Sequence, residues 1–243
     1  MTIIIPMAGL SKRFTDAGFT LPKYMLYARE KSLFNLAVSS FKAYFKTAKF
    51  LFIARDVFCT KEFIQKECDI LGISFFDVVI LNEPTRGQAE TVYLGLLASN
   101  LPTTEPVLIF NIDTFRPNFS FPVELPNWDG YLEVFEGDGA NWSYAKTEHE
   151  NSTKVIQTAE KEEISTHCST GIYYFKKKES FMEAFEAANV DVSKIKLNEL
   201  YVAPLYNYLI AKSFNIHIEI IERNDVMFCG IPQEYYDYLE SIK

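Results

Sequence analysis

The first half of the sequence alternates short apolar runs with stretches of helical periodicity, and this alternation restricts the fold more than any other feature. The apolar runs are typical of buried strands and lie at residues 3–5, 49–54, 75–81 and 106–113. Helical spacing of apolar residues predicts helices at 33–44, with Ser32 as N-cap, and at 60–71 and 88–99. Because right-handed crossovers join strands that are separated by helices, we expect an α/β fold with a mostly parallel sheet flanked by helices.

The pattern changes after about residue 128. Short strand-like runs separated by polar turns follow, at residues 129–136, 141–147, 154–160 and 170–176. Their spacing favours antiparallel strands added to the sheet. Further helices are predicted at 179–188, 199–211 and 232–241, with a strand at 215–221. The sequence has no internal repeat or flexible linker, so we expect one mixed α/β domain over residues 1–243, made of two halves that meet near residue 128.

Composition argues against several classes of protein. A chain of 243 residues is long enough to bury the core of one large domain. The formal net charge of −8 argues against a general nucleic-acid-binding protein, so nucleic acid is not expected as a partner. The sequence has no apolar run as long as a membrane span, and Met1-Thr2 leads directly into the first strand without the pattern of a signal peptide. We therefore expect a cytoplasmic protein with no membrane insertion.

The cysteines and histidines form no pattern typical of a metal site or a nucleophile. The cysteines lie apart in the sequence and form no C-x-x-C pair, at Cys59, Cys68, Cys168 and Cys229. The three histidines lack the i, i+4 spacing of metal ligands on a helix. Neither a zinc site, a disulfide framework nor a Cys-His mechanism is predicted.

The segment after the first strand, "MAGLSKRFTDAGFTLPKYML" at residues 7–26, is the most informative local feature. It combines Gly9 with three cations, Lys12, Arg13 and Lys23, and has no helical periodicity, so we expect a loop. Loops at the carboxyl ends of strands are where open α/β sheets bind their ligands. Flexible backbone and clustered cations in an otherwise acidic protein predict an anion-binding site.

Motifs in order along nearly the whole chain resemble the sugar-phosphate nucleotidyltransferases, specifically members that make capsule or lipopolysaccharide precursors. The matching stretches are "IIIPMAGLSKRF", "LPKYML", "NEPTRGQAETV", "NID" at 111–113, "AEKEE" at 159–163, "TGIYYF", "NELYVAPLYNYL" and "CGIPQEYYDYL". The resemblance implies a Rossmann-like GT-A nucleotidyltransferase fold. It also implies a nucleotide-binding half at about 1–128 and an acceptor-binding half at about 129–243.

The same resemblance implies the reaction and its residues. The family transfers a nucleoside monophosphate from a nucleoside triphosphate to a small phosphorylated acceptor and releases pyrophosphate, with Mg²⁺ or Mn²⁺ as cofactor. The residues that match its catalytic positions are Arg13, Lys23 and Asp113, and Asp113 is also the metal ligand. The nucleotide-binding positions are Ala8, Gly9, Leu10, Ser11, Asn82, Gly87, Gln88 and Asn111. The acceptor-binding positions are Glu160, Lys161, Gly171 and Glu199.

The chemistry explains why these residue types are needed. The acceptor phosphate is largely ionised because its second pKa is about 6, so the attack needs no protein base. What remains is to hold two polyanions together and to neutralise charge on the leaving group. The backbone N–H groups of residues 8–11 can surround phosphates, Arg13 can bind two oxygens at once, and Lys23 suits the α-phosphate. Asp113 supplies a hard oxygen ligand for a metal.

Each assignment has an ordinary structural alternative. Arg13 and Lys23 could be solvated surface cations, as we expect for Lys12. Carboxylate and amide side chains such as Asp113 and Asn111 also favour turns. The run "EKEE" could be a solvated charged face, and residues 82–88 an ordinary loop with a helix cap. Aromatic residues are more often core than pocket, which applies to Tyr173, Tyr174, Tyr201 and Tyr206.

The sequence departs from the family pattern at two places. Ser11 and Lys12 stand where relatives have Gly-Ser, which restricts the loop if that position needs a positive φ. Phe228 stands where many relatives carry a second metal-binding Asp, and Asp225 could replace it only if the loop is rearranged. A second metal is therefore not expected to be held in the usual way.

Other functions stay open at this point. A GT-A glycosyltransferase would normally have D-x-D at the metal strand, where this chain has Asn111 in place of the first Asp. A catalytically silent nucleotide-binding protein would explain Ser11 and Phe228 but not the retention of the cationic residues. A Rossmann dehydrogenase lacks support because no G-x-G-x-x-G follows the first strand. Lack of long helical extensions favours CTP as the triphosphate, whereas the sequence does not define the acceptor or the oligomeric state.

Overall fold

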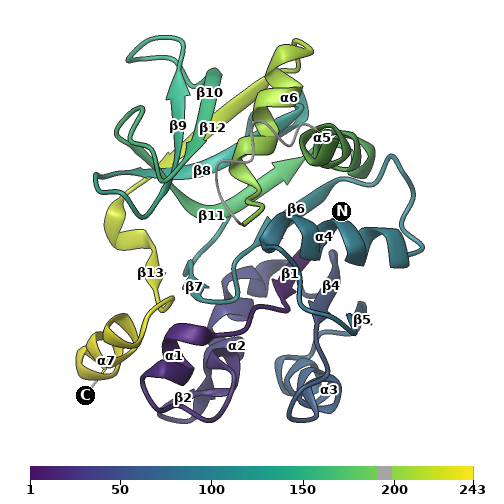
Figure 1. Cartoon of the computed structure of the whole chain (residues 1–243), viewed down its shortest axis with the longest axis vertical. Coiled ribbons are helices and arrows are strands. Elements are labelled where there is room, and N and C mark those ends of the chain that lie inside the picture. The colour runs from purple at the N-terminus through teal and green to yellow at the C-terminus, as the bar shows by residue number, and fades with distance from the viewer. Residues whose placement is uncertain (191–198, 243) are drawn as a thin grey trace.

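A computed structural model of the protein describes residues 1–190 and 199–242. Its centre is a sheet of nine strands that runs β10-β9-β11-β6-β1-β4-β5, with β8 paired to β11 and β12 paired to β8 (Figure 1). The parallel part of the sheet comes from the first half of the chain and consists of β1 (Thr2–Met7), β4 (Lys49–Ala54), β5 (Phe76–Ile80) and β6 (Val107–Phe110). Their carboxyl ends therefore meet at one edge.

The second half of the chain extends this sheet with mainly antiparallel strands. They are β8 (Gly130–Glu136), β9 (Ser143–Thr147), β10 (Val155–Glu160), β11 (His167–Phe175) and β12 (Ile216–Ile221). β11 pairs antiparallel with β6 and so joins the two halves, and β12 runs parallel to β8. The register of β11 against β8 shifts between Ser169 and Tyr173, which is a bulge beside the carboxyl end of β6.

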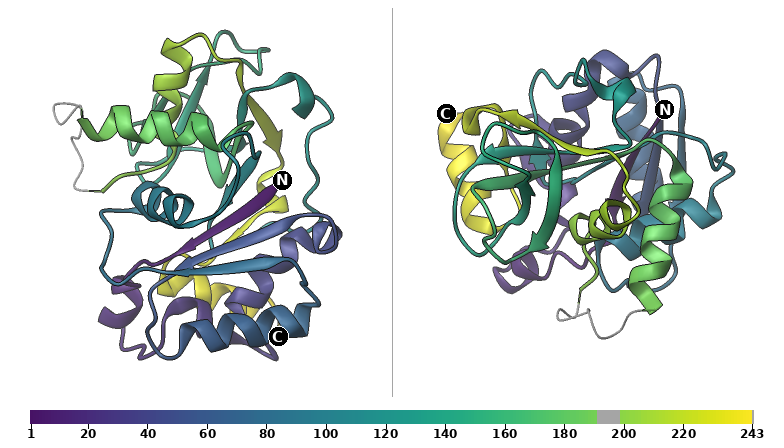
Figure 2. Two further views of the ribbon diagram at one scale, coloured as in Figure 1. Left: turned by 90° about the vertical axis from the view of Figure 1, so that its right-hand side faces the viewer. Right: turned by 90° about the horizontal axis from the view of Figure 1, so that it is seen from above.

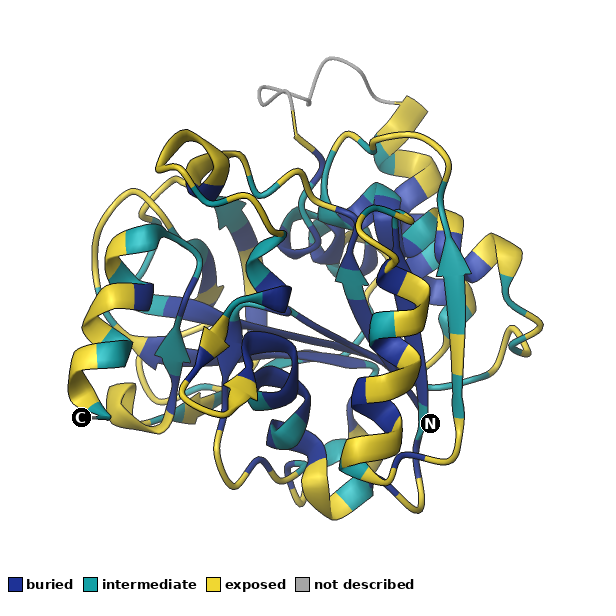
Figure 3. Ribbon diagram, turned by 90° about the horizontal axis from the view of Figure 1, so that it is seen from below, coloured by how far each residue is buried: buried dark blue, intermediate teal, exposed yellow. Residues whose placement is uncertain are grey.

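Helices cover both faces of the sheet (Figures 1 and 2). One face is covered by α2 (Leu33–Val38) and α3 (Thr60–Leu71), and the other by α4 (Gln88–Ala98), α5 (Lys178–Val190) and α6 (Tyr206–Ala211). α7 (Pro232–Ser241) lies farther out on the first side, where Tyr235 packs on Phe14 and Phe19. Alternate residues of β1 supply the two cores, because Ile3 and Ile5 pack with the first group of helices and Ile4 with the second. Figure 3 shows the strands buried between helices whose outer faces are exposed.

Short elements connect these layers around the strand ends. They are α1 (Lys12–Asp16), η1 (Lys23–Met25), β2 (Tyr27–Ala28), β3 (Lys31–Ser32), η2 (Ser39–Tyr44), β7 (Thr114–Phe115), η3 (Leu125–Asn127), η5 (Ala203–Leu205), η6 (Arg223–Asp225) and β13 (Met227–Phe228). β2 pairs antiparallel with β3, and β7 pairs antiparallel with β13. This pairing places the end of the chain beside the segment that follows β6.

The predicted mostly parallel mixed sheet flanked by helices is confirmed. The predicted N-cap at Ser32 is confirmed as well, since its hydroxyl accepts the backbone N–H of Asn35 at 3.0 Å. Within the described part of the chain, no helix has the length and apolar character needed to cross a membrane. The four cysteines are free thiols, and Cys59 is the exposed one.

Two predicted local structures are wrong. The segment at 7–26 is not loop throughout, because α1 and η1 lie within it. A single turn such as α1 needs one buried anchor, here Phe14, and so leaves no periodic pattern to detect. The helix predicted at 199–211 begins only at Ala203, directly before Pro204, which lacks the N–H that an earlier helical turn would use. The stretch "NELYVAPLYNYL" begins at residue 198, which lies outside the described residues.

Candidate active site

Lys23 and Asp113, each of which is predicted to be catalytic, lie in direct contact. Lys23 begins η1 and its Nζ donates to Oδ2 of Asp113, which follows β6 by three residues. The two side chains are 21% and 22% exposed, so the pair is screened less than a surface ion pair yet is open to a ligand. The backbone N–H of Cys229 donates to the carbonyl of Asp113 at 2.7 Å and fixes the position of this segment.

The loop between β1 and α1 places backbone beside this pair. Gly9 and Leu10 are exposed, and nothing lies within 4 Å of the point where a Cβ on Gly9 would be. Ser11 adopts a left-handed conformation, with φ 49 and ψ 31, and its hydroxyl oxygen accepts the backbone N–H of Lys23 at 3.4 Å. The position that differs from the family pattern is therefore one that needs a positive φ. Ala8 is buried at the base of the loop.

Arg13 projects from α1 into solvent. It is exposed, like Lys12, and its charge acts on Tyr201 in the second half of the chain. Burial and the contact with Glu199 raise the pKa of Tyr201, and the guanidinium of Arg13 opposes this shift. The charge of Arg13 therefore reaches Tyr201, which contacts the predicted acceptor residues Lys161 and Glu199.

Asn111, Gln88 and Gly171 form one packed group at the carboxyl edge of the sheet. The side-chain amide of Gln88, the first residue of α4, donates to Oδ1 of Asn111. Gly171, at the bulge of β11, has φ 93, and a Cβ there would lie 2.4 Å from Nδ2 of Asn111. Glycine at 171 therefore allows the close approach of Asn111. Of the remaining predicted base-contacting residues, Asn82 is exposed and, within residues 1–190 and 199–242, forms no hydrogen bond with this group.

Gly87 packs against the segment that carries Glu199 and Tyr201. It has φ 140, and a Cβ there would lie 2.6 Å from the carbonyl oxygen of Leu200. The backbone of Leu200 forms hydrogen bonds on both sides of Gly87. Its N–H donates to the carbonyl of Arg86 at 2.7 Å, and its carbonyl accepts from the N–H of Ala89 at 2.9 Å. Gly87 consequently has a structural role that connects the start of α4 with residues 199–201.

The predicted acceptor residues Glu160, Lys161 and Glu199 form a second cluster. Nζ of Lys161 donates to the Tyr201 hydroxyl and lies 3.9 Å from a carboxylate oxygen of Glu199, to which the same hydroxyl donates. Glu160 accepts from the hydroxyl of Ser143, which in turn accepts from Tyr173 at 3.3 Å. Burial raises the pKa of Glu160, although the Ser143 hydrogen bond and the charge of Lys161 lower it. The cluster offers a cation and several hydroxyl groups to an anionic polar ligand.

Two residues around the site, Ser143 and Arg55, were not predicted from the sequence. Ser143 was not predicted, and a serine at the start of a strand carries no distinguishing signal. Arg55 was also missed, although it directly follows β4 at the same edge of the sheet as Asp113. A charged residue shortly after a buried strand, as Asp113 is after β6, is the signal that could have identified Arg55.

Comparison with solved structures identifies the family. A nucleoside-diphosphate-sugar pyrophosphorylase from Vibrio cholerae RC9 is 52% identical, with a TM-score of 0.94 over 98% of this chain and 99% of that chain. This chain belongs to the nucleoside-diphosphate-sugar pyrophosphorylase family. More distant structures share the fold: an inositol-1-phosphate CTP transferase from T. maritima (TM-score 0.73, 13% identity, 100% and 96% covered) and a putative glucose-1-phosphate thymidylyltransferase from Bacillus anthracis (0.73, 15%, 99% and 94%). A scan of protein-family models and a search of curated proteins gave no match.

Within this pyrophosphorylase fold, Phe228 is part of an aromatic cluster. Its ring centroid lies 4.8 Å from that of Trp142 and 5.8 Å from that of Phe135, and the guanidinium carbon of Arg223 lies 4.9 Å from the ring of Phe228. Asp225 is exposed in η6. The segment that carries a second carboxylate in many relatives thus presents an apolar wall here.

The donor set around Asp113 fits a metal that is held mainly by substrate. Over residues 1–190 and 199–242, no three His, Cys, Asp or Glu side chains converge into a complete metal site. Mg²⁺ in phosphate-transfer sites is commonly bound through one or two carboxylates, with substrate phosphates and waters as the other ligands. Asp113, one partly exposed carboxylate beside the predicted phosphate-binding loop, would meet that requirement.

Proposed function

We propose that this pyrophosphorylase-family protein transfers a nucleoside monophosphate from a nucleoside triphosphate to a small phosphorylated acceptor. The observation that carries the proposal is the contact of Lys23 with Asp113 beside the Gly9–Ser11 loop. A cation, a carboxylate and accessible backbone N–H groups at the carboxyl ends of parallel strands are the components that a triphosphate needs. The 52% identical Vibrio cholerae protein is named as a nucleoside-diphosphate-sugar pyrophosphorylase, which supports the same reaction class.

In the proposed reaction, a phosphate oxygen of the acceptor attacks the α-phosphorus of the triphosphate. A P–O bond forms to the acceptor, the bond to the β-phosphate oxygen breaks, and that oxygen leaves with its electron pair on pyrophosphate. Lys23 holds the α-phosphate and the incoming phosphate together, which lowers the entropic cost of bringing two polyanions into contact. Arg13 binds the departing pyrophosphate through two N–H groups. The protein's contribution is thus positioning and charge neutralisation.

Asp113 would hold Mg²⁺ or Mn²⁺ together with triphosphate oxygens. The metal supplies neutralisation of the phosphate charge when it is bound. Lys23, which contacts the Asp113 carboxylate here, is then free to turn its ammonium group to phosphate. Both residues are partly exposed, so this exchange needs no change in the core.

The acceptor is proposed to bind at the Lys161 cluster. Lys161 provides the charge for the acceptor phosphate, and Glu160 accepts a hydrogen bond from a hydroxyl group of the acceptor. Glu160 is suited to a neutral hydroxyl group because its carboxylate can only accept hydrogen bonds and already accepts one from the Ser143 hydroxyl. The names of structural neighbours, among them a CTP transferase, a UDP-glucose pyrophosphorylase and a thymidylyltransferase, are compatible with sugar and polyol phosphates.

We further propose that the triphosphate is CTP and that the protein acts in the cytoplasm, in the synthesis of precursors for capsule or other cell-surface polysaccharides. The support for this proposal is the resemblance of "CGIPQEYYDYL" and the compact chain. A screen of CTP, UTP, dTTP, ATP and GTP against phosphorylated sugars, polyols and small metabolites, with pyrophosphate as readout, tests the reaction and both substrates. Pyrophosphate release that depends on both a triphosphate and an acceptor is expected. Absence of release from every pair would overturn the proposed function.

Metal dependence is tested separately. We expect EDTA to abolish activity and Mg²⁺ or Mn²⁺ to restore it. Asp113→Asn should lose about a hundredfold or more in kcat, because a preorganised charge that acts on the transition state is removed. The variant must keep the wild-type thermal transition. Full turnover in EDTA, or in the folded Asp113→Asn variant, would contradict the metal role.

A further inference from the structure

The carboxylate of Asp113 lies against a glycine from the end of the chain. A Cβ on Gly230 would lie 3.2 Å from Oδ2 of Asp113, the oxygen that accepts from Lys23. The φ of Gly230 is not positive, so the absence of a side chain matters here and not conformational freedom. The preceding residue, Cys229, donates its N–H to the carbonyl of Asp113 at 2.7 Å. Asp113 is thus held at its backbone by Cys229 and bordered at its carboxylate by Gly230.

Glu234, in the first turn of α7, fixes the backbone of this glycine. One carboxylate oxygen, Oε2, accepts the N–H of Gly230 at 2.7 Å and the N–H of Ile231 at 3.2 Å. Hydrogen bonds from backbone N–H groups to a charged carboxylate are roughly twice as strong as those between neutral groups. The side chain of Glu234 is partly buried. Glu234 therefore holds the segment that borders Asp113 in one position.

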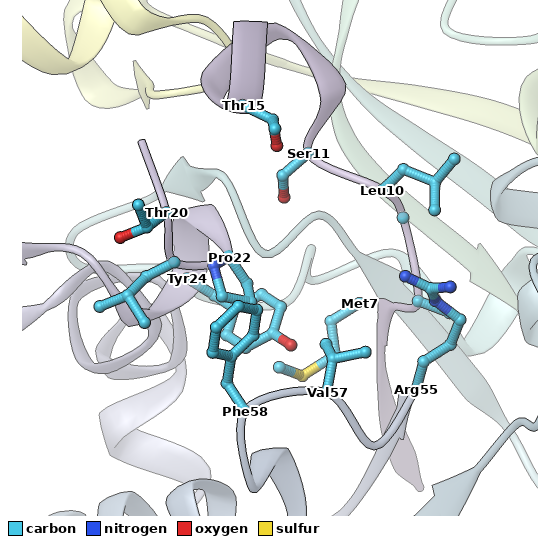
Figure 4. Close-up of a pocket in the computed structure, with 13 residues that line it drawn as sticks. Met7, Leu10, Ser11, Thr15, Thr20, Pro22, Tyr24, Arg55, Val57 and Phe58 are labelled. Carbon is cyan, nitrogen blue, oxygen red and sulfur yellow. The ribbon is translucent and has the colours of Figure 1, made fainter. Parts of the chain in front are cut away.

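α7 itself is anchored to the part of the chain that follows the proposed phosphate loop. That loop borders a pocket of about 100 Å³, which it shares with the loop after β4 (Figure 4). α1 begins directly after Ser11 and carries the buried Phe14, whose ring centroid lies 6.4 Å from that of Tyr235 of α7. The hydroxyl of Tyr235 donates to the carbonyl of Tyr27 at 2.8 Å. These contacts fix α7 independently of Glu234, which gives its carboxylate a firm base.

The composition of the site makes the orientation of Asp113 important. Phe228 directly precedes Cys229 and contributes an aromatic ring, packed on Trp142, where many relatives carry a second carboxylate. A metal held by one carboxylate and by substrate oxygens depends on how that carboxylate is oriented. Residues that orient a metal ligand from outside the coordination shell typically contribute 10–100-fold to metal affinity or activity.

We propose that Glu234 is a positioning residue for Asp113, because it holds the Cys229–Gly230 backbone against the Asp113 side chain. The inference rests on the proposed nucleotidyltransferase function. In the free protein, Lys23 also fixes the Asp113 carboxylate. When Lys23 turns to the triphosphate, that contact is lost, and the segment held by Glu234 keeps the carboxylate in one orientation. Glu234 acts through Gly230 and need not touch the substrate.

Two variants of Glu234 test this role by kcat and by water proton relaxation with Mn²⁺ and CTP, UTP, dTTP, ATP or GTP in the absence of acceptor. Relaxation is enhanced when Mn²⁺ is immobilised on the protein, so it reports metal binding without turnover. Glu234→Ala should lower Mn²⁺ affinity and kcat about tenfold or more. Glu234→Gln keeps an oxygen that accepts from Gly230 and Ile231, so both values should recover to within about threefold of wild type. Glu179→Ala, which removes an exposed carboxylate from the first turn of α5, is the matched control and should keep wild-type values.

Gly230→Ala tests the same coupling without touching the start of α7. The new Cβ would crowd Oδ2 of Asp113, whose carboxylate must move by a few tenths of an ångström. Mn²⁺ affinity and kcat should therefore fall while the thermal transition stays near that of wild type, because the backbone at Gly230 is unstrained. This variant also decides the question if Glu234→Ala does not fold. A role of Glu234 in capping α7 alone would instead predict lower stability with unchanged Mn²⁺ affinity and kcat.

Failure of this inference is distinguishable from failure of the proposed function. Wild-type Mn²⁺ affinity and kcat in folded Glu234→Ala or Gly230→Ala would overturn the positioning role. Equal losses in Glu234→Ala and Glu234→Gln would also overturn it, since charge and not hydrogen bonding would then be the cause. In each case, pyrophosphate release by wild type in the substrate screen would still support the reaction. Conversely, Mn²⁺ binding that depends on Glu234, without pyrophosphate release from any substrate pair, would support the positioning role and overturn the reaction.

Discussion

At the scale of single residues, Ser11 shows how a departure from a family pattern can be tested. Its φ of 49 is a conformation that glycine adopts without cost, whereas other residues lose about 1–3 kcal/mol there. The compensating hydrogen bond from Lys23 is long, at 3.4 Å. Serine at this position is therefore tolerated by the loop without being required for its shape.

Ser11→Gly is accordingly expected to raise the free energy of unfolding by up to about 1 kcal/mol and to keep or improve triphosphate affinity. Urea unfolding and steady-state kinetics measure the two effects. A loss of kcat beyond about tenfold in the folded variant would show instead that the serine hydroxyl acts in catalysis.

Variants of Arg13 and Lys23 should differ in the kinetic constants that they change. Arg13→Lys is expected to lower kcat, because an ammonium cannot bind two phosphate oxygens as a guanidinium does. Lys23→Ala is expected to lower kcat and also kcat/KM for the acceptor, since in the proposed reaction Lys23 holds both reacting phosphates. Each effect should reach about 2.7–4 kcal/mol in transition-state stabilisation, as for loss of one preorganised donor. Lys66→Ala, on the exposed side of α3, is the control for loss of a positive charge and should keep wild-type kinetics. Wild-type kinetics in both Arg13→Lys and Lys23→Ala would show that neither residue takes part in the reaction.

At the scale of elements, the sequence predicted best those whose start is signalled locally. β4 and α3 lie at the predicted 49–54 and 60–71, and α7 begins at Pro232, a residue favoured in the first helical turn. What could not be predicted is contact between segments that carry no periodic signal. The bonds of Leu200 to Arg86 and Ala89 join residues more than a hundred positions apart, and neither side shows a strand pattern. The same limit hid the contact of Lys23 with Asp113, although each residue was predicted from its place after a strand or in the basic segment.

The Leu200 pairing gives a prediction for Gly87→Ala. The new Cβ would lie 2.6 Å from the Leu200 oxygen, so the 199–201 segment must move away from the start of α4. Because Glu199 and Tyr201 flank Leu200, we expect KM for the acceptor to rise several-fold more than KM for the triphosphate, and stability to fall by about 1–3 kcal/mol. Gly139→Ala is the matched control, since Gly139 also has a positive φ, of 100, but nothing lies within 4 Å of its Cβ position. Equal changes in both KM values would argue against this coupling.

At the scale of the whole molecule, Arg116 connects the two halves of the chain. Its backbone N–H donates to Oγ of Ser40 in η2 at 2.9 Å, and its Nε donates to Glu133 of β8 at 3.1 Å. Glu133 is 1% exposed and also accepts from the hydroxyl of Thr170 in β11 at 3.1 Å. It lies directly opposite Glu219 of β12, and the charge of Arg116 lowers the pKa of both of these neighbouring carboxyl groups.

Arg116→Met should therefore destabilise the protein in a pH-dependent way. Burial raises the pKa of Glu133 and Arg116 lowers it, so removal of Arg116 must raise that pKa further. A carboxyl group whose pKa is higher in the folded than in the unfolded state stabilises the fold most at a pH below its ordinary pKa. This stabilisation is lost as the pH rises through the raised pKa. We expect a loss of about 3–5 kcal/mol near pH 8, where Glu133 would be an unpaired buried charge, and a smaller loss near pH 5. Urea unfolding at the two pH values measures both. Addition of Glu133→Gln to Arg116→Met should remove most of the difference between pH 5 and pH 8, whereas an equal loss at both pH values would show that lost packing, not charge, is the cause.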